Sequence, residues 1–286
     1  MLNIGLIGKT ENFEPHVKRI QKNSNINVIG KASFGTDTRL NSFHFSIPEI
    51  NRIELIERAD VILMDNSLPL PFGLLCDIVK KSKHIFAVEY LNLSIEEGTQ
   101  LFKLANESGS VIQVCNPFFY KPAIQWLNKN LANPAYLDIS YFATEPINKN
   151  TLTSLLFMLI GATGISPKKV AAVAFQSGKI NSRFYNVRLE FGNASVVNIN
   201  YGNLSQLNEF KIKAYSEGQF ISLNFLNKTF LCQNNPVDLS NQSINEFDVF
   251  INSVMNKTKT MSNIEDYLIV LYLVQKINKK LSLFSA

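Results

Sequence analysis

Short runs of β-favouring apolar residues alternate with amphipathic helical runs over residues 1–115. Parallel strands cannot be joined by a tight turn, so each pair needs a crossover connection, which is usually a helix. This alternation therefore predicts βαβ units on a parallel sheet, the arrangement of an α/β domain. We expect the strands at residues 4–8, 26–29, 61–64, 84–88 and 111–115.

Helices are expected between these strands, where apolar residues recur at helical spacing. The run at residues 47–59 places Ile50, Ile53 and either Ile56 or Leu55 on one apolar face. Ser94 opens a later helix, and Glu97, three residues on, completes a capping box with it. The other helices of this half are expected at residues 14–21 and 71–81.

The pattern changes after residue 117, where alternating runs follow one another with hairpin signals between them. The turns at residues 192–193 and 217–218 are of this kind, and they predict a mainly antiparallel sheet that is open on one face. Strands are expected at residues 136–142, 185–191, 194–201, 210–215, 220–225 and 229–232, and helices at 123–131, 152–160, 244–255 and 263–280.

The last of these helices begins with a second capping box, formed by Ser262 and Glu265. Taken together, the two patterns predict an α/β domain at residues 1–118, followed by an α+β domain at residues 119–286.

The composition is that of a globular chain, with 46% hydrophobic and 18% charged residues and a net charge of +5. The basic residues are scattered or lie at expected helix ends, where they interact favourably with the helix dipole, so we expect no nucleic-acid partner. The longest apolar run, residues 155–162, is far shorter than the ~20 residues that span a bilayer. Without a signal-peptide pattern, the expected location is the cytoplasm, with no membrane partner.

The three cysteines, Cys76, Cys115 and Cys232, are far apart and have no histidine or second cysteine at metal-ligand spacing. We therefore expect buried thiols, with neither a disulfide framework nor a metal site.

Several local motifs, in order, resemble those of one oxidoreductase family. Residues 59–64 are similar to its ADxVxIxTP strand, residues 84–91 to its GKHVxxEKP segment, and residues 117–122 to its crossing into the second domain. Phe250, Ser262, Glu265 and Asp266 are similar to its C-terminal F…S…ED region. The chain thus resembles the Gfo/Idh/MocA family, which is named for glucose–fructose oxidoreductase and inositol dehydrogenase.

The resemblance implies a Rossmann-like dinucleotide-binding-type domain and a family-type C-terminal domain. It implies NAD(P) as cofactor, a sugar, polyol or related small molecule bound in the cleft between the domains, and a homodimer or higher oligomer formed through the C-terminal sheet. Carried over position by position, it assigns cofactor contacts to Gly8, Lys9, Thr10, Asn66 and Glu89.

The glycine fingerprint of such domains is mostly absent. Its three glycines allow a tight turn, a close approach of backbone to pyrophosphate, and close helix–strand packing. Residues 8–13 keep only Gly8, while Phe13 puts a large ring where close packing is needed. Lys9 could instead neutralise a phosphate in a remodelled loop. At the end of the second strand no carboxylate is present to read a ribose, although Lys31 and Ser33 could meet a 2′-phosphate.

The catalytic positions that the resemblance implies have also changed. Tyr90 occupies the place of the family's catalytic lysine, next to the retained Glu89, and Thr151 and Ser154 stand where a histidine and an aspartate are expected. Tyr90 could act as a general acid if a cation lowered its pKa, or it could simply pack as an aromatic side chain. The family's arginine before the crossing helix is replaced by Phe119.

Three functions remain open. The first is a catalytically degenerate pseudo-oxidoreductase that binds a small ligand or a partner. The second is an active NAD(P)-dependent oxidoreductase with a rebuilt site around Tyr90. The third is a structural subunit of a homo- or hetero-oligomer, because alternating apolar residues of the open sheet could face a core or a partner: Val187, Leu189, Val197 and Ile199.

Overall fold

The computed structural model describes residues 1–32, 47–67, 70–131, 134–148, 150–177, 182–240 and 244–284. The chain forms two compact units, and each is described by itself. Unit 1 contains Met1–Cys115 and Asn245–Leu268, and unit 2 contains Asn116–Ile244 and Ile269–Ala286.

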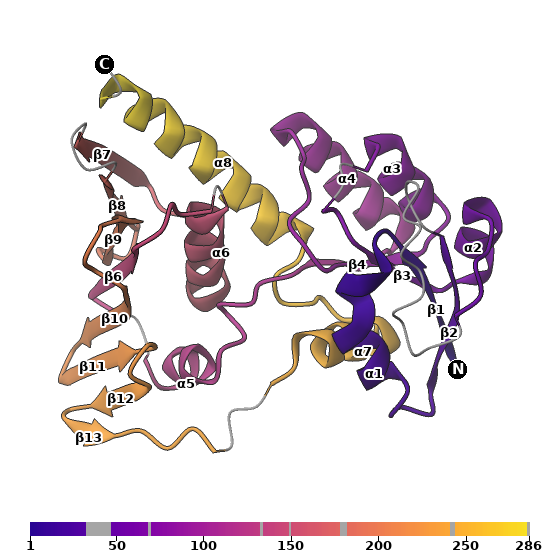
Figure 1. Cartoon of the computed structure of the whole chain (residues 1–286), viewed down its shortest axis with the longest axis horizontal. Helices are drawn as coiled ribbons and strands as arrows, with labels where there is room; N and C mark the ends of the chain where they lie inside the picture. The colour runs from indigo at the N-terminus through magenta and orange to yellow at the C-terminus, as the bar shows by residue number, and fades with distance from the viewer. Residues whose placement is uncertain are drawn as a thin grey trace. The chain divides into compact units, whose positions relative to one another are not determined.

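Unit 1 is built on a five-stranded parallel sheet with the order β2-β1-β3-β4-β5 (Figure 1). All four residues of β3 are buried, as expected for a strand that has structure on both faces of the sheet. The predicted parallel sheet is therefore confirmed. Its strands are β1 (Leu2–Ile7), β2 (Ile26–Ala32), β3 (Val61–Met64), β4 (His84–Ala87) and β5 (Ile112–Val114).

The helices between these strands are α1 (Glu14–Ile20), α2 (Arg52–Arg58), α3 (Phe72–Lys80) and α4 (Ile95–Ser108). The predicted capping box of α4 is confirmed. Ser94 Oγ accepts from the Glu97 N–H at 3.1 Å, and the Ser94 N–H donates to Glu97 Oε2 at 2.8 Å. Gly109, in the left-handed conformation, ends the helix.

Helix α2 is shorter than the expected helix at residues 47–59, and one predicted buried residue is wrong. The backbone of residues 48–50 pairs with Lys31 at the end of β2, and Asn51 then caps the helix. Ile53 therefore lies in the first turn of α2, where it is 63% exposed, while Leu55 and Ile56 are buried.

The segment Asn245–Leu268 belongs to unit 1, although the sequence placed it in a second domain of residues 119–286. Its helix α7 (Glu246–Asn256) packs Phe247, Phe250 and Ile251 into the same hydrophobic core as β1 and β3. Contacts between segments so far apart in the chain leave no periodicity in the sequence, which explains why a simple division missed them.

Unit 2 is built on an eight-stranded sheet with the order β13-β12-β11-β10-β6-β9-β8-β7. All its neighbouring strands are antiparallel except β6 and β9, so the predicted mainly antiparallel sheet is confirmed. The strands are β6 (Tyr136–Ala143), β7 (Lys169–Ser177), β8 (Ser182–Glu190), β9 (Val196–Asn203), β10 (Glu209–Ser216), β11 (Gln219–Asn224), β12 (Thr229–Cys232) and β13 (Asn235–Pro236). Strands β7 and β13 were not predicted.

Helices α5 (Pro122–Asn130) and α6 (Thr151–Thr163) lie on one side of this sheet (Figure 1). The four alternating apolar residues that could face a core or a partner are almost fully buried within unit 2: Val187, Leu189, Val197 and Ile199. They therefore form part of its core. Helix α8 (Ile264–Leu281) is the longest helix described, and no helix in the described ranges is both long and apolar enough to cross a membrane.

Candidate functional site

The carboxyl ends of β1, β3 and β4 meet at one edge of the unit 1 sheet, where ligands bind in open α/β folds. Gly8 follows β1 and has a φ of +127°, a backbone angle that residues other than glycine rarely adopt. A Cβ atom at this position would lie 2.7 Å from both the Cβ and the carbonyl oxygen of Asp65, the residue after β3. Glycine is thus required here by both conformation and space.

The Asp65 side chain is 1% exposed, and its carboxylate is surrounded by donors. Oδ2 accepts from the Lys9 N–H at 2.9 Å and from Ser67 Oγ at 2.8 Å. Oδ1 accepts from Asn12 Nδ2 and from the Ser67 N–H, each at 3.1 Å. These four hydrogen bonds compensate the cost of burying the charge. Asp65 was not among the predicted site residues, although it is a carboxylate directly after a four-residue buried strand, a pattern that the sequence displays.

The loop after Gly8 continues as a 3-10 turn, η1 (Thr10–Phe13), before α1 begins at Glu14. The Phe13 ring is buried in the core of unit 1, and this residue caps α1 without a side-chain hydrogen bond. The Thr10 side chain lies outside what the structure describes. The start of α1 is therefore separated from the end of β1 by a full turn.

Asn66 joins the loops that follow β3 and β4. Its Nδ2 donates to the Tyr90 carbonyl oxygen at 3.0 Å, and its Oδ1 accepts from the Leu70 N–H at 3.2 Å. The side chain predicted to contact a cofactor therefore holds the two loops together.

Glu89 is exposed at the same edge, and partial burial raises the pKa of its carboxyl group. The negative charge of Asp65 raises this pKa further, whereas Lys9 lowers it. The structure thus brings Gly8, Lys9 and Glu89 together with Asp65, a cluster with two carboxylates and one ammonium group.

Tyr90 also lies at this edge, and its ring stacks on the ring of Tyr267. The ring centroids are 6.1 Å apart and the planes differ by 4°. The Tyr267 hydroxyl donates to the Leu91 carbonyl oxygen at 2.6 Å, and burial raises the pKa of Tyr267 above its usual value. Both contacts hold the loop after β4 against the first turn of α8.

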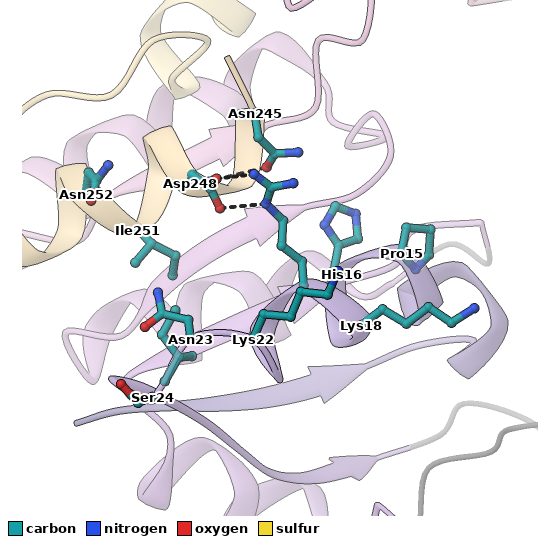
Figure 2. A pocket seen from close by; sticks show the side chains of 12 residues that line it. Pro15, His16, Lys18, Lys22, Asn23, Ser24, Asn245, Asp248, Ile251 and Asn252 are labelled. Atoms are coloured by element: carbon teal, nitrogen blue, oxygen red, sulfur yellow. Dashed lines mark hydrogen bonds and ion pairs between the residues drawn. The ribbon is translucent and has the colours of Figure 1, made fainter. Parts of the chain in front are cut away.

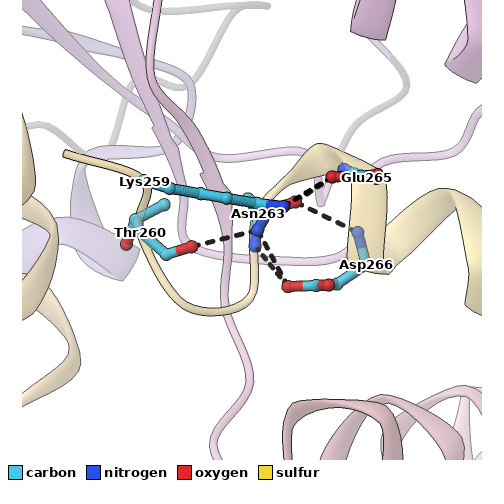
Figure 3. A network of polar contacts seen from close by, with 5 residues as sticks. All are labelled: Lys259, Thr260, Asn263, Glu265 and Asp266. Atoms are coloured by element: carbon cyan, nitrogen blue, oxygen red, sulfur yellow. Dashed lines mark hydrogen bonds and ion pairs between the residues drawn. The ribbon is translucent and has the colours of Figure 1, made fainter. Parts of the chain in front are cut away.

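Tyr267 lies in the first turn of α8, which begins with a capping box (Figure 3). This capping box is one residue later in the chain than the predicted one. Asn263 Oδ1 accepts from the N–H groups of Glu265 and Asp266, at 2.8 and 3.1 Å, and the Asn263 N–H donates to Asp266 Oδ2 at 3.3 Å. The predicted pair of Ser262 and Glu265 is therefore wrong. Ser262 has φ of +58°, so it lies in the turn before the helix.

The remaining predicted cofactor positions lie at the end of β2. Lys31 Nζ is 3.9 Å from Glu49 Oε2, and Ser33 lies outside the described residues. Lys31 therefore has a carboxylate partner from its own unit. Among the described residues, no group of three His, Cys, Asp or Glu side chains is placed to hold a metal ion.

The other substituted positions belong to unit 2. Thr151 is buried in the first turn of α6, and Ser154 Oγ donates to the Asn150 carbonyl oxygen at 2.9 Å. Phe119 is fully buried, and a Cβ atom added to Gly161 of α6 would lie 2.9 Å from its ring. These side chains take part in the local packing and hydrogen bonding of unit 2.

No protein-family model matches the sequence, and a search of curated proteins finds no significant match. Solved structures of similar fold are nevertheless numerous. UDP-N-acetylglucosamine 3-dehydrogenase GnnA from Acidithiobacillus ferrooxidans has a TM-score of 0.79 at 17% identity, covering 99% of this chain and 98% of its own. The WlbA dehydrogenase from Chromobacterium violaceum, solved with NADH and UDP-GlcNAcA, has a TM-score of 0.76 at 12% identity, with 98% and 93% covered.

A biliverdin reductase from a Synechocystis species, solved with biliverdin and NADP+, has a TM-score of 0.74 at 13% identity, with 98% of this chain and 99% of its own covered. At these identities the likeness establishes the fold. The chain has the fold of the Gfo/Idh/MocA oxidoreductases that its motifs resemble.

Proposed function

We propose that this chain is a pseudo-oxidoreductase, a Gfo/Idh/MocA-type protein that has lost ordinary NAD(P) binding and hydride transfer and binds a small molecule or a partner protein instead. The observation that carries the proposal is the hydrogen bond from the Lys9 N–H to the buried Asp65 carboxylate. A donor of the loop after β1, where dinucleotides are normally held, is already taken by a side chain of the protein.

Charge supports the same conclusion. A phosphate group within about 4 Å of the Asp65 carboxylate would be repelled by about 4 kcal/mol at an effective dielectric constant of about 20. Lys9 offsets part of this repulsion, but exposed Glu89 adds to it. The turn between Gly8 and α1 also removes the helix N-terminus from its usual place beside the pyrophosphate. The residues present therefore do not fit a dinucleotide.

The substituted catalytic positions argue against proton transfer. Tyr90 stacks on Tyr267, and the Ser154 hydroxyl bonds to its own helix. With Thr151 buried at the start of α6, the positions of the family's lysine, aspartate and histidine all hold hydroxyl groups, in place of an amine, a carboxylate and an imidazole.

Calorimetric titration with NADH and NADPH tests the proposal, with the WlbA dehydrogenase, solved with NADH, as the positive control. We expect no binding heat at about 1 mM cofactor, a concentration at which a Kd in the micromolar range would be evident. Micromolar binding, or NAD(P)H turnover with any sugar or polyol, would overturn the proposal. If turnover were lost in Tyr90→Phe while cofactor affinity stayed unchanged, the active enzyme with a rebuilt site would be the correct function.

A second candidate function is that of a structural subunit, assembled through the outer face of the unit 2 sheet. Strand register puts Tyr136, Asp138, Asn186, Asn198 and Asn200 on the face opposite the buried apolar residues. They form a half-buried polar ladder, in which Asn186 donates to Asn200 at 2.8 Å and Asn200 to Asp138 at 3.1 Å. In the described part of unit 2, α5 and α6 lie on the other side (Figure 1).

A hydrogen-bonded polar face of this kind suits an isologous contact between two copies of the chain. Sedimentation of the purified protein tests this candidate, with Asn200→Arg as the disrupting variant and Asn224→Arg, on the same face of β11, as a more peripheral substitution. We expect a dimer that Asn200→Arg dissociates and Asn224→Arg weakens less. A monomer at all concentrations would exclude assembly through this face.

A further inference from the structure

A pocket of about 820 Å³ opens in unit 1 between α1, the turn after it and the start of α7 (Figure 2). Its volume lies within the range of small-molecule sites. None of its lining residues belongs to the edge that carries Gly8, Asp65 and Tyr90, so it is a separate feature of the unit.

The lining of this pocket carries an excess of positive charge. Lys18, Arg19 and Lys22 project from α1 and its end, against a single carboxylate, that of Asp248. Lys18 is paired with Glu14 in the same helix. Lys22 has no side-chain partner among the described residues, so its ammonium group is available to a ligand.

Arg19 contributes donors in a fixed orientation. Its Nε donates to Asp248 Oδ1 at 2.8 Å and its Nη2 to Oδ2, a two-point pairing that joins α1 to α7. The guanidinium group has five N–H bonds in one plane, and this pairing leaves the two on Nη1 directed elsewhere. The hydrogen bond to Asp248 raises the pKa of Arg19, which keeps the group charged.

Asn245 supplies a second oriented donor beside this pair (Figure 2). Its Oδ1 caps α7 by accepting from the N–H groups of Phe247 and Asp248, at 3.0 and 3.2 Å. The side-chain NH₂ group must therefore turn away from the helix. The buried residues Ile26 and Ile251 add apolar surface to the lining of the pocket.

We propose that this pocket binds a small organic molecule bearing a phosphate or carboxylate group, with Arg19 and Lys22 as the charge partners, Asn245 as an added donor, and the carbon skeleton against Ile26 and Ile251. Asp248 orients Arg19 and at the same time lowers the affinity, because its charge opposes that of the ligand. The site is independent of the proposed loss of NAD(P) binding.

Calorimetry on the full chain tests this site with four probes: inorganic phosphate, citrate, glucose 6-phosphate and glucose. We expect the anions, but not glucose, to bind with Kd values of about 1 mM or lower. Stronger binding of glucose 6-phosphate than of citrate would assign a phosphate ligand, and the reverse order a carboxylate ligand. No heat from any of the three anions at about 10 mM would overturn the proposal.

Variants locate the binding. Arg19→Gln should weaken the strongest anion about tenfold, and Lys22→Gln about threefold. The matched control is Arg58→Gln, because Arg58 is an exposed arginine of α2 paired with Glu54 at 2.9 Å. Equal losses in Arg19→Gln and Arg58→Gln would show nonspecific attraction and reject the site.

Arg19→Gln also breaks the link between α1 and α7, so a second variant separates binding from folding. Asp248→Asn keeps an acceptor for Arg19 but removes the opposing charge, and we expect it to tighten anion binding about threefold. A purely structural role for the pair predicts weaker or unchanged binding in Asp248→Asn, which would contradict the proposal.

Discussion

The backbone N–H of Lys9 donates a 2.9 Å hydrogen bond to the buried carboxylate of Asp65. This contact connects the loop after β1 to the end of β3, two neighbouring strands of the parallel sheet. In dinucleotide-binding folds, N–H groups of this loop face a pyrophosphate. Here an anionic side chain of the protein itself satisfies the donor.

Asp65→Asn should destabilise unit 1 strongly. An amide would turn an NH₂ group toward either the Lys9 N–H and Ser67 hydroxyl or the Asn12 NH₂ group and Ser67 N–H, leaving buried donors without an acceptor. We expect a loss of about 2–4 kcal/mol in the free energy of unfolding, measured by urea denaturation.

The control for this change is Asp238→Asn. Asp238 makes the same local contacts with a serine two residues later, accepting from the Ser240 N–H at 2.8 Å and from its hydroxyl at 3.0 Å. Because Asp238 is exposed, its replacement should change stability little. Equal losses in the two variants would mean that the buried network at Asp65 has no special role.

Gly8→Ala should also destabilise the protein, by about 2 kcal/mol or more, since a Cβ atom would meet Asp65 at 2.7 Å in a backbone conformation that alanine avoids. Gly73→Ala is the matched control. Nothing lies within 4 Å of a Cβ atom at Gly73, in the first turn of α3, so this change should raise stability by up to about 0.5 kcal/mol. Thermal unfolding of both variants measures the difference.

Most elements of the fold could be predicted because their burial is periodic. An apolar run predicts a strand such as β3, and helical spacing together with capping residues predicts a helix such as α4. The start of α2 could not be predicted, because pairing of residues 48–50 with β2 overrides the helical spacing of the isoleucines. In β7 the inward positions include Ala172, whose small side chain weakens the alternation.

The sequence could name Gly8, Glu89 and Tyr90 as candidates because each occupies a motif position, and the structure places them shortly after β1 and β4. The decisive partners of these residues could not be named, because their effect depends on the fold. Asp65 acts through a loop 56 residues away, and the Tyr267 hydroxyl bonds to Leu91, 176 residues away. No local pattern in the sequence records contacts over such separations.

Tyr267→Phe should weaken the loop after β4. The substitution removes the hydroxyl that donates to the Leu91 carbonyl at 2.6 Å but keeps the ring that stacks on Tyr90. We therefore expect the free energy of unfolding to fall by about 1–2 kcal/mol. Tyr272→Phe, at a position of α8 that is 50% exposed, should leave stability unchanged. Denaturant titration compares the two variants, and hydrogen exchange at residues 90–93 should speed up only in Tyr267→Phe.

His16 should make the stability of the protein depend on pH. Its ring packs edge-on against Phe86 and Phe247, and burial, followed by the charge of Arg19, lowers its pKa from 6.5 to about 4. Between these two values the unfolded chain binds the proton more readily than the folded chain, so stability falls as the pH drops. Between pH 7 and pH 5, the titration of His16 alone should lower the free energy of unfolding by about 2 kcal/mol. His16→Gln should remove most of that loss in urea titrations at the two pH values. His84→Gln should retain the part due to His16 and remove only the part due to His84, whose pKa burial also lowers. An unchanged slope in His16→Gln would assign the pH dependence to other groups.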